Sequence, residues 1–533
     1  MYFLNNGTGY ALYKEEAEKK YYVDKSLLID ELYRYVRQIN KYICITRPRR
    51  FGKSVCANMI AGFFDESVAE KSHELFMNLD IGKLWSEHQT DTPEHPSCWV
   101  YQGKKKVVHI NFNNIQTEKV TSYQLFCDAL YEKIESDISH IYPIVNESGV
   151  LAISDIFLNT GDRFVFVIDE WDSVLERDFM TEEDRKSYIL LLKALFKDQP
   201  YVDFVYMTGI LPISKYTSGS PLNMFTEFTS FGDGIFYPWF GLTKDEIQKV
   251  MKKRGTTSPT IDELEFWYDG YVRSFDCVHM YNPTSVSAAL AEGTCRSHWT
   301  GTGPMNEVRD TVMHNVKEVR EDVIRMTGGE TLNIKLTGFS VEKPLINSRD
   351  EILSSMVVYG FLTYFDESLA IPNHELMLKF QEALYSEELG LKQTLDESKK
   401  LLRATLERKH TEIASCLEEL HNEKIPFFHY NDENSLACVV TMGYIAAVDR
   451  YRIIREDKAG KGYVDFLFIP MRKTDMAIIL ELKYNRSAGA ALKQIHERDY
   501  IKRLKDFTNV LLVGINYSEK TKKHTCLTEL VEQ

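Results

Sequence analysis

A short polar loop between an apolar strand and a helix has the residue types needed to bind phosphate. The segment 47–54, RPRRFGKS, follows the apolar stretch 42–46 and precedes a helix with one apolar face. The backbone N–H groups of such a loop and the positive end of the helix attract phosphate oxygens. We expect Gly52 to permit close backbone approach, Lys53 to reach the β- and γ-phosphates, and Ser54 to bind Mg²⁺.

The loop departs from the usual G-x-x-x-x-G-K-[ST] pattern, because Arg47 stands where the first glycine is expected. Arg47, Arg49 and Arg50 supply planar guanidinium groups that suit phosphate oxygens. We predict that Arg49 and Arg50 contact the nucleotide, although exposure or pairing with acids is an open alternative. An ordinary capped helix with an exposed lysine would also contain the sequence Gly-Lys-Ser.

Two acidic residues follow a second apolar segment. Residues 164–168, FVFVI, are apolar on both faces, as a central parallel strand requires, and end in Asp169-Glu170. Sites of α/β proteins lie at this end of the strands, so we expect Asp169 to hold Mg²⁺ and Glu170 to polarise the attacking water. The alternative is a solvated acidic pair that caps the next helix. Thr208 ends a third strand, where it would either sense the γ-phosphate or serve as a local cap.

A second set of acidic residues lies near the C-terminus. Glu481 and Lys483 are two residues apart in an apolar strand, so they share one face. A hairpin would bring Asp465 beside Glu481, and two carboxylates suit Mg²⁺ or Mn²⁺. Lys483 would then orient or deprotonate a water, and Glu433 would add a third carboxylate. The alternative is an exposed Glu–Lys pair at a strand end.

The charge distribution favours the same region for nucleic acid. The whole chain has a formal net charge of -14, which argues against a general polyanion binder. From Tyr451 to the C-terminus, however, the chain contains 16 Lys and Arg residues but only 11 Asp and Glu residues. The basic helix after Lys483 also offers Gln494 and Tyr500 near the expected phosphate. Nucleic acid is therefore expected at the C-terminal site.

These sites require three regions, because strands and helices alternate first, helices then dominate, and strands finally return. We predict an α/β N-terminal region 1–242 with a parallel sheet, a helical middle region 243–382 and a small mixed sheet within 383–533. A winged-helix-like arrangement is one interpretation of the middle region. The predicted strands are 42–46, 107–112, 164–168, 202–208, 235–240, 464–469, 477–482 and 509–515.

The composition is that of globular protein. With 533 residues, 44% apolar and 27% charged, the chain is expected to form two or three domains. Its nine cysteines are scattered singly, without the close pairs of zinc or redox sites. No signal segment or run of eighteen apolar residues occurs, so we expect a cytoplasmic protein without membrane contact. A homo-oligomer is left open.

Three motifs in order, YYVDKS at 21–26, RPRRFGKS at 47–54 and IDEWD at 168–172, resemble those of the bacterial AAA-ATPase-like family. Members carry the same arginine-rich loop, so the missing glycine is a family trait. YDGY at 268–271 and Asn282-Pro283 match further motifs of the family. The resemblance implies a P-loop NTPase fold and ATP as the nucleotide.

The C-terminal region resembles the PD-(D/E)XK nuclease fold, which is restriction-endonuclease-like and commonly follows the AAA-ATPase-like domain. The proline of that motif is absent before Asp465, and the fold also occurs in inactive forms.

The leading hypothesis is an ATP-dependent, metal-dependent nuclease. The second is a nucleotide-dependent switch or signalling protein whose last domain binds nucleic acid or a partner without cutting. The third is a scaffold with two degenerate sites. The sequence does not distinguish DNA from RNA.

Overall fold

The computed structural model of the chain divides into two compact units, Met1–His298 with Leu336–Asp366, and Trp299–Lys335 with Glu367–Gln533. The middle region is therefore shared between the units, and its boundaries remain predictions. The structure describes residues 1–87, 97–115, 119–142, 152–213, 221–229, 234–272, 277–298, 317–327, 329–334, 348–384, 392–421, 433–459, 462–472, 474–505 and 507–533.

The first unit is built on a five-stranded sheet in the order β2-β3-β4-β1-β5. Every neighbouring pair of strands is parallel, which confirms the predicted α/β fold. The carboxyl ends of all five strands consequently meet at one edge of the sheet. The strands are β1 (Tyr42–Thr46), β2 (Lys106–Asn111), β3 (Phe164–Asp169), β4 (Val202–Gly209) and β5 (Thr226–Phe228).

One predicted strand is wrong. Residues 235–240 contain the short 3₁₀ helix η5 (Tyr237–Trp239), and the fifth strand is β5 instead. Pro238 has no N–H to give to a ladder and its fixed φ suits the start of a helix, so the aromatic run does not pair as a strand.

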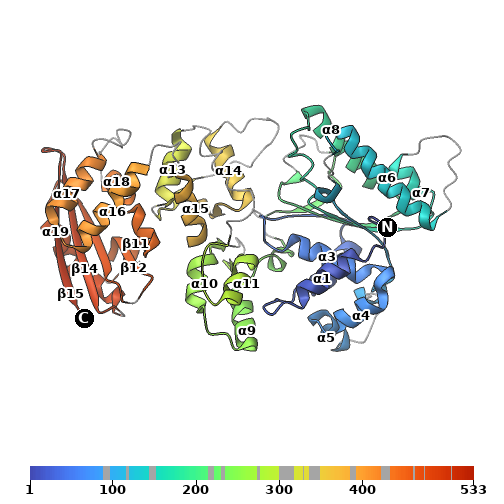
Figure 1. Ribbon diagram of the computed structural model, residues 1–533, viewed down its shortest axis with the longest axis horizontal. Helices are drawn as coiled ribbons and strands as arrows, with labels where there is room; N and C mark the ends of the chain where they lie inside the picture. The colour runs from blue at the N-terminus through green and yellow to red at the C-terminus, as the bar shows by residue number, and fades with distance from the viewer. Residues whose placement is uncertain are drawn as a thin grey trace. The chain divides into compact units, whose positions relative to one another are not determined.

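Helices cover both faces of this sheet, with α6, α7 and α8 on one face and α1 and α3 on the other (Figure 1). Phe166 and Ile168 of β3 belong to the core under α6 to α8, whereas Val165 and Val167 belong to the core under α3. The helices of this part are α1 (Thr8–Ala17), α2 (Leu28–Gln38), α3 (Lys53–Phe64), α4 (Ala69–Met77), α5 (Asp80–Glu87), α6 (Tyr123–Ile141), α7 (Ile153–Leu158) and α8 (Glu182–Phe196).

The same alternation decides where the polar strand-end residues point. Asp169 is two residues beyond Val167, so it lies on the face that α3 covers. Thr208 is two residues beyond Tyr206, which belongs to the core under α3, so Thr208 lies on that face too. Asn111 is paired with Asp169 across the β2–β3 ladder. Three strands thus direct polar side chains toward the start of α3.

The middle region is mostly helical, as predicted, but it also contains short strand pairs. Two of its motif residues act locally, since the Tyr268 hydroxyl donates to the Arg296 carbonyl and Asn282 caps α11 by accepting from two backbone N–H groups. The Tyr271 hydroxyl instead donates to the distant Gly360 carbonyl at 2.6 Å. The elements are α9 (Lys244–Arg254), α10 (Ile261–Tyr268), β6 (Tyr271–Val272), β7 (His279–Met280), α11 (Pro283–Glu292), α13 (Lys317–Thr327), β8 (Leu332–Asn333), α14 (Arg349–Tyr359), β9 (Thr363–Phe365), β10 (Ser368–Ala370) and α15 (His374–Leu384).

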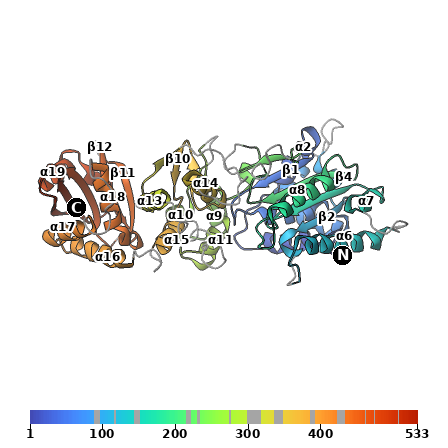
Figure 2. The ribbon, with the colours of Figure 1, turned by 90° about the horizontal axis from the view of Figure 1, so that it is seen from above.

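The second unit contains a five-stranded sheet in the order β11-β12-β13-β14-β15. Only β13 and β14 pair in parallel, so the predicted mixed sheet is confirmed. Figure 2 shows its strands between α19 on one face and α16 with α17 on the other. The elements are α16 (Lys392–Leu406), α17 (His410–Glu419), α18 (Glu433–Gly443), β11 (Tyr451–Ala459), β12 (Gly462–Pro470), β13 (Ala477–Tyr484), α19 (Ala488–Glu497), the 3₁₀ helix η10 (Tyr500–Leu504), β14 (Asn509–Ser518) and β15 (Lys523–Glu532).

We expect Gly209→Ala to destabilise the first unit. A Cβ at Gly209 would lie 2.5 Å from the Trp171 ring and 2.6 Å from Asp172 Oδ1, both of them buried. Such overpacking costs about 1–3 kcal/mol of the free energy of unfolding. Urea unfolding followed by tryptophan fluorescence measures the loss, with Ser139→Ala on the exposed side of α6 as the control. Equal midpoints for the two variants would contradict the prediction.

Candidate functional site

The phosphate-binding loop lies between β1 and α3, as the sequence predicts. Gly52 has a φ of 87° at the N-cap of α3, a conformation that favours glycine. A Cβ at this position would meet nothing within 4 Å, so the space beside the loop is open. Backbone N–H groups at the start of α3 can therefore be approached by a phosphate.

Lys53 lies buried at the first turn of α3. Its Nζ donates to the carbonyl oxygens of Arg47 at 2.9 Å and Pro48 at 2.8 Å. Burial lowers the pKa of Lys53 to about 8, and the nearby carboxylates of Asp172, Asp169 and Glu170 oppose the shift. The ammonium group is thus held inside the loop and beside the acidic strand end.

Asp169 is the point where the loop and the acidic motif meet. Its carboxylate accepts a hydrogen bond from Asn111 Nδ2 at 3.1 Å, and the Ser54 side chain lies close enough to lower its pKa. Burial raises the pKa of Asp169 to about 6, which the Ser54 side chain opposes. Ser54 and Asp169, the two predicted Mg²⁺ ligands, therefore lie side by side. A hydroxyl and a carboxylate form a hard oxygen donor set that fits Mg²⁺.

Glu170 follows in a strained conformation. Its φ is 52°, in the left-handed region that residues other than glycine rarely adopt. Strain of this kind persists where surrounding structure enforces it and is concentrated at functional sites. The N–H of Glu170 donates to Asp169 Oδ1 at 3.1 Å. The assignment of Glu170 to the attacking water stays a prediction.

Thr208 lies at the same edge but inside the protein. Its side chain is fully buried, and its hydroxyl has no hydrogen-bond partner in the described part of the chain. The register pairs Thr208 with Ile45 of β1, one residue before the end of that strand. Its predicted role as a γ-phosphate sensor is not tested by this position.

The three arginines of the loop have three different environments. Arg47 is buried, and its Nη1 donates to the carbonyl oxygens of Thr46 and Phe228, both at 2.8 Å. Arg49 Nη2 lies 3.9 Å from Glu176 Oε2, and Arg50 Nη1 donates to the His298 carbonyl at 2.6 Å. Contacts of Arg49 and Arg50 with a nucleotide stay predictions.

A largely apolar hollow, open to solvent, lies beside Gly52, and the sequence did not predict it. At its edge Lys25 Nζ pairs with Glu246 Oε1 at 2.6 Å and donates to the Pro238 carbonyl at 3.0 Å. The YYVDKS motif at 21–26 was the sequence signal that could have indicated this hollow, because its residues form part of the wall. The hollow is lined by Glu16, Tyr21, Tyr22, Val23, Lys25, Phe51, Gly52, Val55, Cys56, Met59, Trp239, Gly241, Leu242, Pro283 and Ser287.

The C-terminal acids come together as predicted. The antiparallel register of β12 and β13 pairs Phe466 with Leu480, so the next residues, Asp465 and Glu481, face each other on the opposite side. The Asp465 N–H lies 3.5 Å from Glu481 Oε2, and Asp465 Oδ2 accepts from the Leu482 N–H at 2.6 Å. The Asp465 carboxylate thus accepts the Leu482 N–H beyond the last backbone pair of β12 and β13.

Lys483 and α19 enclose Glu481. Lys483 Nζ lies 3.2 Å from Glu481 Oε1 and donates to the Leu482 carbonyl at 2.6 Å. Gln494 of α19 also donates to Glu481, while the Tyr500 hydroxyl donates to the Tyr463 carbonyl at 2.5 Å. Burial and the charge of Asp465 raise the pKa of Glu481 to about 7.

The donor set suits a hard cation, although it is small. Asp465 and Glu481 present carboxylate oxygens, which Mg²⁺ and Mn²⁺ prefer. Within the described residues, no group of three or more His, Cys, Asp and Glu side chains is arranged to hold a metal ion. The side chain of Glu433, the predicted third carboxylate, lies outside what the structure describes.

A parallel sheet with a Gly-Lys-Ser loop after one strand and acids after another defines the first unit as a P-loop domain. Residues 11–217 match the family model described as "Predicted AAA-ATPase", and residues 431–525 match the PD-(D/E)XK nuclease superfamily. The chain therefore joins an AAA-ATPase-like P-loop domain to a C-terminal domain of the PD-(D/E)XK nuclease superfamily.

A curated protein of Azotobacter chroococcum mcd 1, "Uncharacterized protein in vnfD 5'region", is 24% identical over 305 residues. The match spans 54% of this chain and about half, 52%, of that relative. Two solved structures are each 11% identical with a TM-score of 0.32. They are a Walker-type ATPase of Pyrococcus abyssi, with 66% of this chain and 95% of that one covered, and Aeropyrum pernix ORC2 in its ADPNP–ADP complexes, with 68% and 93% covered. Among the described residues, no helix is long and apolar enough to cross a membrane.

We expect Mn²⁺ binding at the C-terminal site to depend on pH through Glu481. Because the folded pKa is raised to about 7, a proton competes with the metal below that pH. The apparent affinity should fall about tenfold per pH unit below 7 and level off above it. Titration calorimetry without nucleotide measures this, with Glu497→Gln on the exposed side of α19 as the control. A profile unchanged in Glu481→Gln would contradict the assignment.

Proposed function

We propose that the first unit binds and hydrolyses ATP with Mg²⁺, and that the second unit is a metal-dependent nuclease acting on nucleic acid. The observation that carries the first part is the proximity of the Ser54 side chain to the Asp169 carboxylate, whose pKa it lowers. It joins the phosphate loop to an acid two strands away in the sheet, which an ordinary capped helix does not require. A bound Mg²⁺ would supply a positive charge that stabilises the phosphate oxygens.

The residues of the loop would divide the work of phosphate binding. Backbone N–H groups after Gly52 would bind the phosphates, and the Lys53 ammonium would exchange its two loop carbonyls for phosphate oxygens. Glu170 would orient a water for attack on the γ-phosphorus and accept its proton as the bond to the β-phosphate oxygen breaks. The low polarity around Lys53 and Asp169 strengthens these interactions.

The apolar hollow beside Gly52 supports a nucleotide rather than a bare phosphate. It adjoins the N-terminus of α3 and has aromatic and aliphatic walls of the kind that hold a flat base. We assign the base and ribose to this hollow.

The nuclease proposal depends on Asp465, Glu481 and Lys483. The two carboxylates would hold Mg²⁺ or Mn²⁺ against a phosphodiester, and Lys483 would orient the attacking water. The excess of Lys and Arg in the last part of the chain favours a polyanion at this site.

One observation favours the alternative of a nucleotide-dependent switch that binds nucleic acid or a partner without cutting. Glu481 is 1% exposed and Lys483 is 5% exposed, and the two side chains contact each other. A site so enclosed must open before a phosphodiester reaches the carboxylates.

ATP with Mg²⁺ should raise the thermal stability of the chain, and Lys53→Ala should remove at least about half of that gain. At a hundredfold excess over the dissociation constant, binding stabilises by about 2.7 kcal/mol. Loss of the charged Lys53 contact should weaken binding at least about tenfold. Thermal unfolding with and without ATP measures both effects, and Lys71→Ala, an exposed lysine of α4, is the control. No shift for the unmutated chain would refute nucleotide binding.

Labelled DNA or RNA should be cut in the presence of Mg²⁺ or Mn²⁺, and Glu481→Ala should lower the activity by at least about a hundredfold. Gel analysis of the products measures this, with and without ATP, and with Lys53→Ala run in parallel. Glu497→Ala is the matched control. Absence of cutting under every condition favours the switch, and cutting that survives Glu481→Ala excludes this site as its source.

A further inference from the structure

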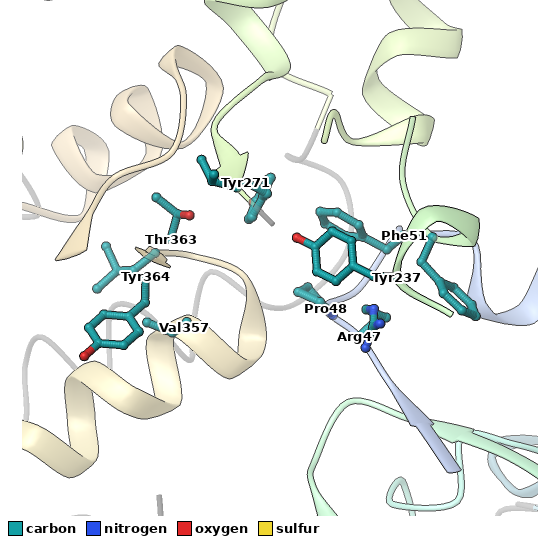
Figure 3. A pocket seen from close by; sticks show the side chains of 11 residues that line it. Arg47, Pro48, Phe51, Tyr237, Tyr271, Val357, Thr363 and Tyr364 are labelled. Atoms are coloured by element: carbon teal, nitrogen blue, oxygen red, sulfur yellow. The ribbon is translucent and has the colours of Figure 1, made fainter. Parts of the chain in front are cut away.

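One motif of the first unit has no role in the nucleotide function proposed above. The sequence YDGY at 268–271 ends in Tyr271, which lies in β6 and is buried. Its hydroxyl donates to the carbonyl of Gly360, 89 residues further along the chain, at 2.6 Å. Figure 3 shows Tyr271 between Pro48 and Phe51 of the phosphate loop on one side and residues of α14 and β9 on the other. Tyr271 therefore lies where the phosphate loop meets the end of α14.

The ring of Tyr271 packs against one end of the loop. Its centre lies 4.8 Å from that of the Phe51 ring, and the two rings are nearly perpendicular at 86°, a favourable arrangement for an aromatic pair. Phe51 is 4% exposed, and its carbonyl accepts the Gly241 N–H at 3.3 Å. Because Gly52 follows directly at the N-cap of α3, the position of Phe51 sets where the first N–H groups of that helix lie.

The hydroxyl of Tyr271 acts on the other end of the loop through Gly360. Gly360 ends α14 with a φ of 83°, and a Cβ there would lie 2.5 Å from Pro48 Cβ, so the two residues are in direct contact. The Pro48 carbonyl in turn accepts from Lys53 at 2.8 Å. One side chain thus contacts the loop at Phe51 and also holds the residue that packs against Pro48.

The loop needs such support because its conformation is not the one that its own residues prefer. Arg50, between Pro48 and Phe51, has a φ of 69°, in the left-handed region that favours glycine. A strained residue of this kind keeps its conformation only where surrounding contacts enforce it. The contacts that Tyr271 and Gly360 make with Phe51 and Pro48 lie on both sides of this residue in the chain.

We propose that Tyr271 is a positioning residue for nucleotide binding, because it holds the phosphate loop at Phe51 and, through Gly360, at Pro48. The inference rests on the nucleotide function proposed above. Affinity is proportional to the fraction of molecules whose loop has the binding conformation, so loss of the Tyr271 hydroxyl lowers it. Nucleotide binding and the contact of α14 with the loop then favour each other by the same factor.

Tyr271→Phe keeps the ring and leaves the Gly360 carbonyl without its donor. The affinity of the full chain for ATP with Mg²⁺, measured by calorimetry, should fall at least about fivefold. Tyr201→Phe is the matched control, because the Tyr201 hydroxyl also donates to a buried backbone carbonyl at 2.6 Å, that of Leu195, but beside the amino end of β4. This control should lower the thermal stability to a similar extent and change the affinity less than about twofold.

A second pair of variants leaves Tyr271 unchanged. Gly360→Ala places a methyl group against Pro48 and should lower the affinity for ATP. Gly293→Ala is its control, because Gly293 has a similar φ of 74° and a Cβ there would meet nothing within 4 Å. The two alanines cause the same kind of backbone strain, so only the contact with the loop distinguishes them.

Hydrogen exchange of the phosphate loop supplies a readout that needs no nucleotide. In the chain without ATP, the amides of residues 49–54 should exchange at least about threefold faster in Tyr271→Phe than in Tyr201→Phe. Mass spectrometry of peptides that contain the loop measures this difference.

Failure of this inference is distinguishable from failure of the nucleotide function. Absence of ATP binding by the unmutated chain refutes the nucleotide function itself. Binding by the unmutated chain that is equally strong in Tyr271→Phe and Tyr201→Phe refutes only the role of Tyr271. Equal exchange of the loop in these two variants, or equal affinity in Gly360→Ala and Gly293→Ala, would also overturn that role.

Discussion

The position of β4 between β1 and β3 is the constraint on which the N-terminal site depends. Arg47, the first loop residue, donates its N–H to the Gly209 carbonyl at 3.1 Å, and Trp171 donates to the Thr208 carbonyl at 3.1 Å. Asp172 Oδ2 accepts the N–H groups of Ile210 and Leu211 at 2.8 and 2.7 Å. The end of β4 thus fixes the phosphate loop on one side and the acidic motif on the other. Its glycine is required because the Trp171 ring occupies the place of a side chain.

Burial gives both sites their electrostatic character. It moves the pKa of Lys53 down to about 8, that of Asp169 up to about 6 and that of Glu481 up to about 7. Each shift reflects the cost of holding a charge away from water. A phosphate or a cation that arrives with the opposite charge removes part of that cost, so these groups are prepared for ligands rather than for maximal stability.

Much of the architecture and of both sites was predictable from local sequence. Apolar runs such as 164–168 predicted central parallel strands, and the two-residue spacing of Glu481 and Lys483 placed them on one face. The sequence did not predict the edge strands β11 and β15. Their apolar residues are interspersed with charged and polar ones, so the hydrophobic pattern of a strand is weak there. The segment 235–240 was misassigned because its aromatic residues favour a strand while Pro238 prevents pairing.

The sequence by itself determined which chemical groups the chain possesses and on which strand ends they occur, because strand periodicity and loop motifs are local properties. Only the tertiary structure decided which groups meet. The Ser54–Asp169 contact requires the strand order, and the hollow beside Gly52 requires segments from the middle region. The orientation of Arg47 was equally hidden, since a guanidinium at the start of the loop can face phosphate or aromatic rings. In the folded chain the Arg47 guanidinium packs against the rings of Tyr237 and Phe240, because contacts with segments distant in the sequence determine the surroundings of each side chain.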